Sequence, residues 1–156
     1  MLRNISMQLD TLITPDIIRV PLQSQDRLGV ITELVELLGT QGLVHDVQKA
    51  IDTAWAREQE RTTGIGEGLA VPHGRCDCID RLVLAIGRTA SPMDFQSFDH
   101  KPVRLVVLVL SPPDDTASHI QVLGGISRLL ADRMTREAAY AAESAEALAH
   151  ILQGRG

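Results

Sequence analysis

Two aliphatic runs most constrain how this chain can fold. Residues 82–86 and 103–110 consist almost entirely of Leu, Val, Ile and Ala, which is typical of strands covered on both faces. We therefore expect both runs in the middle of a sheet. A sheet covered on both faces needs a layer of helices on each side.

Helical patterns flank these runs on both sides in the sequence. After Asp26, apolar residues recur at helical spacing until Gly39, and Asp46 is placed to cap a second helix with its own apolar stripe. Between the second helix and the first aliphatic run, residues 62–68 predict a loop because they contain three alternate glycines. Residues 17–20 and 69–71 predict short strands.

A third amphipathic pattern follows the second aliphatic run. Thr116 or Ser118 is its expected cap. Residues 133–153 predict one or two further helices, the last starting at Ser144. Helices, then strands, then helices predict a three-layer α/β/α sandwich with a central mixed β-sheet.

The composition is close to that of an ordinary soluble protein. The 156 residues are 44% hydrophobic and 22% charged, so we expect one domain over residues 1–156. A formal net charge of −5 argues against nucleic acid as a partner. No apolar run approaches the roughly 20 residues of a membrane span, and residues 1–6 lead into no secretory signal. A cytoplasmic protein that is not embedded in a membrane is expected.

Cys76 and Cys78 stand too close in sequence to close a useful loop, so reduced thiols are predicted. Together with His73 they would supply at most three zinc ligands, at a spacing that matches no common zinc motif. We expect no metal site.

The segment 57–75 gathers most of the residues that could carry chemistry. His73 lies between a strand and a glycine turn, and three interpretations are open: a structural hydrogen-bonding residue, a metal ligand or a nucleophile. Ala70, Val71 and Pro72 offer an apolar wall, and desolvation disfavours the imidazolium form. A neutral ring keeps one nitrogen lone pair free, as a nucleophile requires.

A phosphoryl group on that nitrogen would need hydrogen-bond donors for its oxygens. Arginines suit this role because the guanidinium group donates two hydrogen bonds at once, and hydroxyl groups and backbone amides add neutral donors. The candidates in the segment are Arg57, Arg75, Thr62, Thr63, Gly64, Gly66 and Gly74.

Other polar residues are weaker candidates for a functional role. Glu58 and Glu60 form a carboxylate pair at a helix end, which is typical of a solvated face. His45, His100 and His150 are expected in solvent. The glycines of residues 64–68 lead into a strand, which does not fit a dinucleotide fingerprint.

The stretch Thr63-Gly-Ile-Gly-Glu-Gly-Leu-Ala-Val-Pro-His73-Gly74, preceded by Arg57-Glu58, resembles the phosphorylation-site signature of the enzyme IIA family of the bacterial phosphotransferase system. More narrowly, it is similar to the mannitol/fructose type and its nitrogen-regulatory relatives. Segments after the motif resemble later parts of the same family in order and spacing. They are residues 92–95, Asp99, residues 101–105 and residues 118–120.

The resemblance implies that His73 is the phosphorylated residue, Arg57 the active-site arginine and His119 a second histidine of the site. It also implies a phosphohistidine donor, HPr or its nitrogen-branch counterpart. Because that donor is already a high-energy compound, no cofactor is required. His119 fits, since it begins the apolar stripe of its helix in the first turn, where free amides attract anions.

Three functions remain to be compared. The first is a phosphoryl carrier that passes its group to an enzyme IIB. The second is a regulatory module, in which modified His73 switches the affinity for a target protein. The third is metal-dependent hydrolysis. The absence of a fused IIB or IIC segment in the sequence favours the nitrogen-regulatory branch, with a sugar-specific IIA as the alternative.

Overall fold

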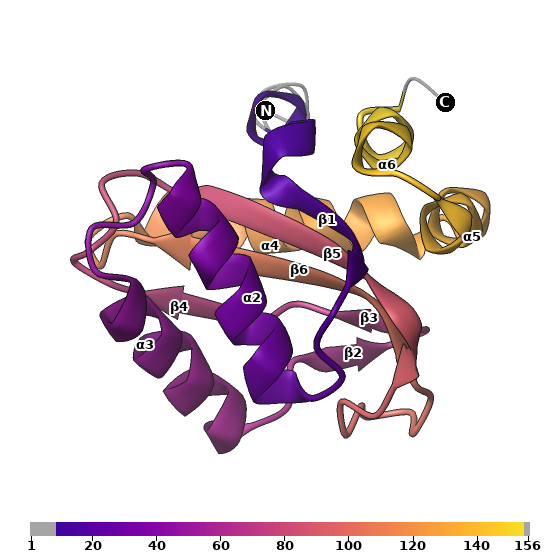
Figure 1. Ribbon diagram of the computed structural model, residues 1–156, viewed down its shortest axis with the longest axis horizontal. Coiled ribbons are helices and arrows are strands. Elements are labelled where there is room, and N and C mark those ends of the chain that lie inside the picture. Colours follow the sequence, from indigo (N-terminus) through magenta and orange to yellow (C-terminus); the bar gives the residue numbers. More distant parts are fainter. Residues whose placement is uncertain (1–8, 155–156) are drawn as a thin grey trace.

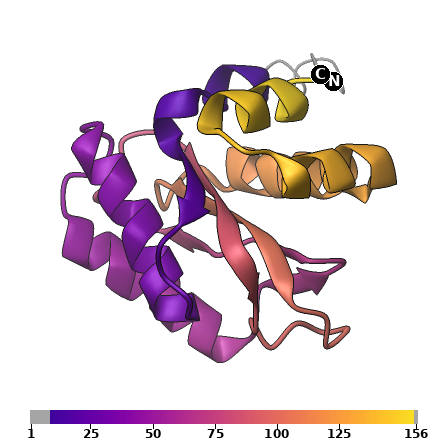
Figure 2. The ribbon, with the colours of Figure 1, turned by 45° about the vertical axis from the view of Figure 1, so that its right-hand side comes forward.

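The computed structural model describes residues 9–154. Residues 1–6, where no secretory signal is predicted, lie outside this range. The described residues form three layers, with a sheet between two layers of helices (Figures 1 and 2). This confirms the predicted α/β/α sandwich.

Helices cover both faces of the sheet (Figure 2). One face carries α2 (Arg27–Thr40) and α3 (Val47–Glu60), and the other carries α4 (Thr116–Ala131), α5 (Arg133–Ala141) and α6 (Ala145–Leu152). The predicted cap at Asp46 is confirmed, because its side chain accepts a backbone N–H group of the first turn of α3. Asp26 and Ser144, which mark the predicted starts of α2 and α6, cap those helices in the same way. The apolar stripe predicted for α2 is buried as Val30, Ile31, Leu34, Val35 and Leu38.

The sheet within the described residues is mixed and has six strands. They are β1 (Ile18–Leu22), β2 (Gly64–Gly66), β3 (Leu69–Ala70), β4 (His73–Arg75), β5 (Val83–Met93) and β6 (Val103–Ser111). The order is β1-β5-β6-β3-β2, and β4 also pairs with β6. The two aliphatic runs, β5 and β6, are central neighbours as predicted, and they pair antiparallel.

Two short strands share one edge of β6 and thereby position His73. β3 runs parallel to the start of β6, and β4 runs parallel to its end, where His73 lies opposite Val109. Pro72 interrupts the pairing between them but still accepts the Val109 N–H through its carbonyl (2.9 Å). The carboxyl end of β6 therefore carries His73 beside it.

The prediction of a loop over residues 62–68 is wrong in part, because Gly64–Gly66 forms β2 and pairs antiparallel with β3. The chain turns between them through Glu67 and Gly68, both at positive φ. Gly64 packs closely on the segment at Ser97: a Cβ there would lie 3.0 Å from the Ser97 Cα. Glycine thus permits a close backbone approach, which outweighs its weak strand propensity.

Three local predictions also need correction. Asp115, and neither Thr116 nor Ser118, caps α4 by accepting the Ser118 N–H. The first aliphatic strand continues beyond residue 86 to Met93, because it forms a long hairpin with β6. β1 runs through Pro21, which is tolerated because β1 is an edge strand.

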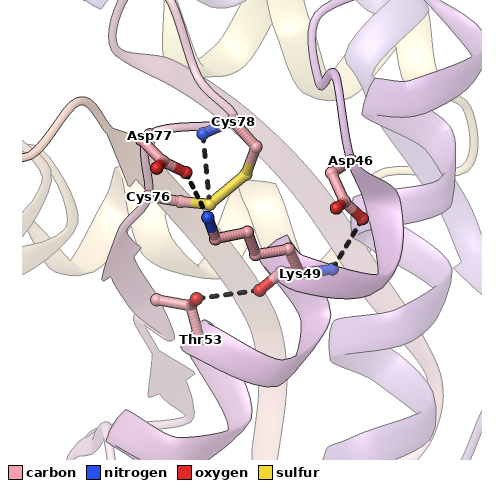
Figure 3. Close-up of a disulfide and its surroundings, with 6 residues drawn as sticks. All are labelled: Asp46, Lys49, Thr53, Cys76, Asp77 and Cys78. Atoms are coloured by element: carbon pink, nitrogen blue, oxygen red, sulfur yellow. Dashed lines mark hydrogen bonds and ion pairs between the residues drawn. A yellow bond between two sulfur atoms is a disulfide. The ribbon is translucent and has the colours of Figure 1, made fainter.

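The prediction of reduced thiols is contradicted, since Cys76 and Cys78 are joined in a disulfide (Figure 3). The turn after β4 brings their Cα atoms to 5.2 Å, within the usual span of a disulfide. Both residues are buried. The bridge closes only a small loop, but its formation depends on how the turn after β4 directs the two side chains toward each other. Lys49 of α3 pairs with the intervening Asp77 (Figure 3).

Candidate active site

Two histidines from distant segments meet at the carboxyl end of β6. His73 begins β4, and His119 lies in the first turn of α4, the helix that follows β6. The ring centroids are 5.4 Å apart with an interplanar angle of 64°. The sheet register and the short connection from β6 to α4 therefore bring the two imidazoles into one site.

The His73 ring has one engaged and one available nitrogen. Nδ1 lies 2.8 Å from the Val71 carbonyl oxygen. Because a carbonyl only accepts, Nδ1 carries the proton of the neutral ring and Nε2 keeps its lone pair. Burial lowers the pKa of His73 below its usual value, and the charges of Arg57 and Arg75 lower it further, against opposing effects of the Val71 carbonyl and Glu58. The ring is thus neutral at pH 7, with the lone pair that a nucleophile requires on Nε2.

His119 is more enclosed and is also neutral at pH 7. Its ring is buried, and its Nδ1 lies 2.7 Å from the Ser111 hydroxyl oxygen. Burial, followed by the neighbouring His73 and Arg75, lowers the pKa of His119 to about 4, although Asp115 opposes the shift. The sequence prediction that His119 begins the buried stripe of α4 is confirmed by its neighbours on that face, Ile126 and Leu130.

Two arginines line the same hollow as the histidines. This hollow, of about 310 Å³, is lined by Thr53, Arg57, His73, Gly74, Arg75 and His119. Arg57 is half-buried near the end of α3, and its Nη1 donates to the Arg61 carbonyl (2.9 Å). Arg75 is exposed at the end of β4 and donates to the Thr116 hydroxyl (2.9 Å). Both guanidinium groups thus flank the His73 ring on a surface open to a partner.

A second hollow, of about 430 Å³, lies on the other side of Arg57 and His73. Its walls include Thr63, Gly64 and three apolar side chains, Ile65, Phe98 and Leu123. Ile65 and Phe98 are exposed, Phe98 to 84%. Both hollows are lined by Arg57 and His73, so His73 borders a charged hollow and a second one that adds exposed apolar side chains.

Some of the predicted phosphate donors are already engaged in hydrogen bonds within the protein. Thr63 has neither donor free, because its N–H and its hydroxyl both donate to the Glu58 carboxylate. The Gly64 N–H donates to the Thr62 hydroxyl (3.0 Å). Gly74 is buried against α3, where a Cβ would lie 3.1 Å from the Thr53 methyl carbon. Arg57, Arg75, Gly74 and His119 share the 310 Å³ hollow with His73, whereas Thr63 and Gly64 line the second hollow.

The prediction that Glu58 and Glu60 are solvated is correct for Glu60 and wrong for Glu58. Glu58 is buried and lies 3.5 Å from Arg27, in addition to its contacts with Thr63. Helical spacing contains the signal that was missed, because Glu58 continues the buried stripe of Ala50 and Ala54. Ser111 was missed as well, although it is a polar residue at the end of an almost entirely aliphatic strand.

The other histidines lie away from this site. His45 pairs with Asp80 at 2.7 Å, with both side chains largely exposed. His100 and His150 are exposed as predicted. No group of three or more His, Cys, Asp or Glu residues within residues 9–154 is arranged to hold a metal ion, and the disulfide removes the two thiolates that the zinc alternative required.

The chain as a whole matches a known family. Residues 11–154 match the family described as the phosphoenolpyruvate-dependent sugar phosphotransferase system, EIIA 2. The chain belongs to this family, and its class is that of a phosphotransferase component. None of the helices in the described part of the chain has the length and apolar character needed to span a membrane.

Curated relatives come from both branches of the family. The chain is 35% identical over 124 residues to a fructose-specific EIIA component of Haloferax volcanii, with 80% of each chain covered. It is 30% identical over 150 residues to a nitrogen regulatory protein of Bradyrhizobium diazoefficiens, covering 94% of this chain and 95% of that one. It is also 30% identical to the fructose-specific EIIABC component of Bacillus subtilis, of which it spans 23%.

Solved structures have the same architecture. The nitrogen regulatory protein IIA-Ntr of Neisseria meningitidis superposes with a TM-score of 0.85 at 27% identity, over 93% of this chain and 99% of that one. The mannitol IIA of Escherichia coli superposes with a TM-score of 0.77 at 21% identity, over 89% and 97%.

Proposed function

We propose that His73 accepts a phosphoryl group on Nε2 from an HPr-like phosphocarrier protein. The main support is the geometry of the His73 ring. The ring is neutral and oriented by the Val71 carbonyl, and it lies in a hollow shared with Arg57, Arg75 and His119. Membership in a phosphotransferase-system family supports a phosphohistidine as the donor.

The transfer needs no cofactor. As Nε2 forms its bond to phosphorus, the bond between phosphorus and the donor imidazole breaks. The donor ring, protonated on its other nitrogen, keeps the electron pair of the broken bond and leaves as a neutral imidazole. His73 retains its proton on Nδ1, held by the Val71 carbonyl. The transferring group carries its negative charge on three equatorial oxygens, and the guanidinium groups of Arg57 and Arg75 and the ring of His119 are placed to stabilise that charge.

The acceptor of the phosphoryl group distinguishes the two branches. We favour a nitrogen-regulatory role, in which the phosphorylation state of His73 controls a target protein. The likeness to the Neisseria meningitidis IIA-Ntr supports it. The alternative, transfer to an enzyme IIB for sugar uptake, is supported by the fructose-specific relative from Haloferax volcanii.

The proposal places the exchange in the cytoplasm, where phosphoenolpyruvate is produced. Disulfides are rare in a reducing compartment, so this location requires the Cys76–Cys78 bridge to withstand the thiol pool or to exist there as a dithiol. Trapping thiols with an alkylating reagent before lysis measures which form is present.

The His73→Ala variant tests the phosphorylation site. The full chain is incubated with phosphoenolpyruvate, enzyme I and HPr, and acid-labile phosphate is measured by mass spectrometry under neutral conditions. Wild type is expected to gain one phosphoryl group and His73→Ala none, because the attacking nitrogen is gone. His150→Ala, which changes an exposed histidine on α6, is the control and should be labelled like wild type. Label that persists in His73→Ala would refute the assignment.

A chase separates the branches. Labelled protein is mixed with candidate IIB domains, and the loss of phosphate is followed over time. Rapid loss to one of them supports sugar transport, whereas retention of the label supports regulation.

A further inference from the structure

Ser111 is a buried hydroxyl beside the second histidine of the site. It is the last residue of β6 and is fully buried. Its Oγ lies 2.7 Å from His119 Nδ1. Its backbone is fixed as well, because its carbonyl accepts the Cys76 N–H (3.0 Å) and it lies opposite Arg75 in the pairing of β4 with β6.

The position of Ser111 determines which nitrogen of His119 remains available. Nδ1 faces the buried hydroxyl, while the ring also lines the hollow that it shares with His73. Among the hydrogen bonds of residues 9–154, the His119 ring has no partner other than Ser111. Nε2 is therefore the nitrogen left for a group bound at His73.

The two tautomers of a neutral His119 differ in what Nε2 offers. If the hydroxyl donates to Nδ1, the proton of the ring lies on Nε2, which then donates to an acceptor in the hollow. If the hydroxyl accepts from Nδ1, Nε2 presents a lone pair. A lone pair would repel phosphoryl oxygens, which bear negative charge and only accept hydrogen bonds.

We propose that Ser111 is a positioning residue that donates to Nδ1 of His119 and thereby keeps the Nε2 proton directed at the phosphoryl group on His73. This inference rests on the proposed function of His73. The two histidines then hold opposite tautomers: His73 is protonated on Nδ1 by virtue of the Val71 carbonyl, and His119 is protonated on Nε2 by virtue of Ser111.

The sequence context explains why a hydroxyl is needed at this position. β6 is otherwise almost entirely aliphatic and buried. An alanine at residue 111 would leave Nδ1 of His119 without a partner in a buried place, and the ring could then carry its proton on either nitrogen. The loss would affect His119 and leave the hydrogen bond between His73 and Val71 in place.

The tautomers are measured directly by long-range ¹H–¹⁵N NMR of the imidazole rings in the full, unphosphorylated chain at pH 7. Wild type is expected to show His119 protonated on Nε2 and His73 protonated on Nδ1. In Ser111→Ala, the signals of His119 should move toward a mixture of tautomers, while those of His73 stay unchanged. His119 protonated on Nδ1 in wild type would overturn the proposal, and this readout needs no variant to fold.

Kinetics provide the second readout. Phosphoryl transfer from HPr to His73 should be about tenfold slower in Ser111→Ala, the factor that one such hydrogen bond supplies. Ser118→Ala changes a partly buried serine one residue before His119 and should transfer at the wild-type rate. A wild-type rate in Ser111→Ala would also overturn the proposal.

The two proposals fail in different ways. If wild type is not phosphorylated on His73, the proposed function fails, whereas the tautomer of His119 still tests the role of Ser111. If wild type is phosphorylated but the Ser111→Ala ring keeps the Nε2 proton, the role of Ser111 alone is wrong.

Discussion

At the scale of single residues, the buried carboxylate of Glu58 organises the loop between α3 and β2. It accepts the N–H of Thr63 (3.1 Å) and its hydroxyl, and it lies 3.5 Å from Arg27. Thr63 in turn accepts the Val71 N–H through its carbonyl (3.0 Å), and Val71 accepts Nδ1–H of His73. A chain of hydrogen bonds thus links the end of α3 to the orientation of the His73 ring.

Glu58→Gln is expected to lower the free energy of unfolding by about 2 kcal/mol. The substitution removes the negative charge of the buried carboxylate, so Arg27 loses its ion-pair partner. Urea unfolding followed by circular dichroism measures the change. Glu60→Gln, an exposed position in the same turn of α3, is the control and should stay within about 0.5 kcal/mol of wild type. Equal effects of the two substitutions would contradict the role assigned to Glu58.

At the scale of elements, the β2–β3 hairpin shows how contacts override local propensity. Three alternate glycines disfavour a strand, yet β2 pairs with β3 and β3 pairs with the start of β6. Gly64 is buried against Ser97, and its carbonyl accepts the Phe98 N–H (3.3 Å). The hairpin therefore connects the His73 segment to the segment that carries the exposed Phe98.

Gly64→Ala is expected to lower Tm by roughly 3–8 °C, because its Cβ would lie 3.0 Å from the backbone Cα of Ser97 and the segment would have to move. Gly124→Ala is the matched control. Its Cβ would meet only the flexible end of Arg128 within the described residues (3.3 Å), and alanine is the better helix former. Thermal unfolding by calorimetry should show Gly124→Ala at or above the wild-type Tm. A Tm of Gly64→Ala equal to wild type would show that the packing at Ser97 is looser than described.

At the scale of the whole molecule, the three layers assemble the site from both helical faces and the sheet between them. Arg57 comes from α3 on one face, His119 from α4 on the other, and His73 and Arg75 from β4. Burial in this assembly keeps both imidazoles neutral. Their protonation state is therefore a property of the folded molecule, and it links the site to global stability.

Stability is expected to decrease as the pH falls from about 6.5 toward 4. The folded-state pKa of His119 is about 4, and the pKa of His73 is also lowered from its ordinary value of 6.5, so the unfolded chain binds more protons in this range. The free energy of unfolding is thus highest above pH 6.5, and His119 accounts for a loss of up to about 3 kcal/mol by pH 4.

Urea unfolding at pH 7, 6 and 5 checks this dependence. His119→Gln cannot take up the proton, so its free energy of unfolding should change less with pH than that of wild type. Identical slopes for the two proteins would contradict the assignment to His119.

Much of the fold could be predicted from the sequence. The aliphatic runs indicated β5 and β6, helical spacing indicated the helices, Asp46 was recognised as a cap, and Asp26 and Ser144 marked the starts of α2 and α6. These features are carried by residues close together in the chain, so periodicity and capping chemistry reveal them. The motif around His73 likewise lies in one contiguous segment and indicated the family.

The tertiary structure alone decided which groups face one another. It buried Glu58 against Thr63, joined Cys76 to Cys78 and placed Ser111 beside His119. A sequence pattern shows that one face of a helix or strand is buried. Which atoms pack against that face depends on strand register, helix placement and turn geometry. The residues of each of these pairs lie close together in the chain. The turns that bring them into contact are held by pairing with distant segments, such as that of β4 with β6, which local sequence patterns do not reveal.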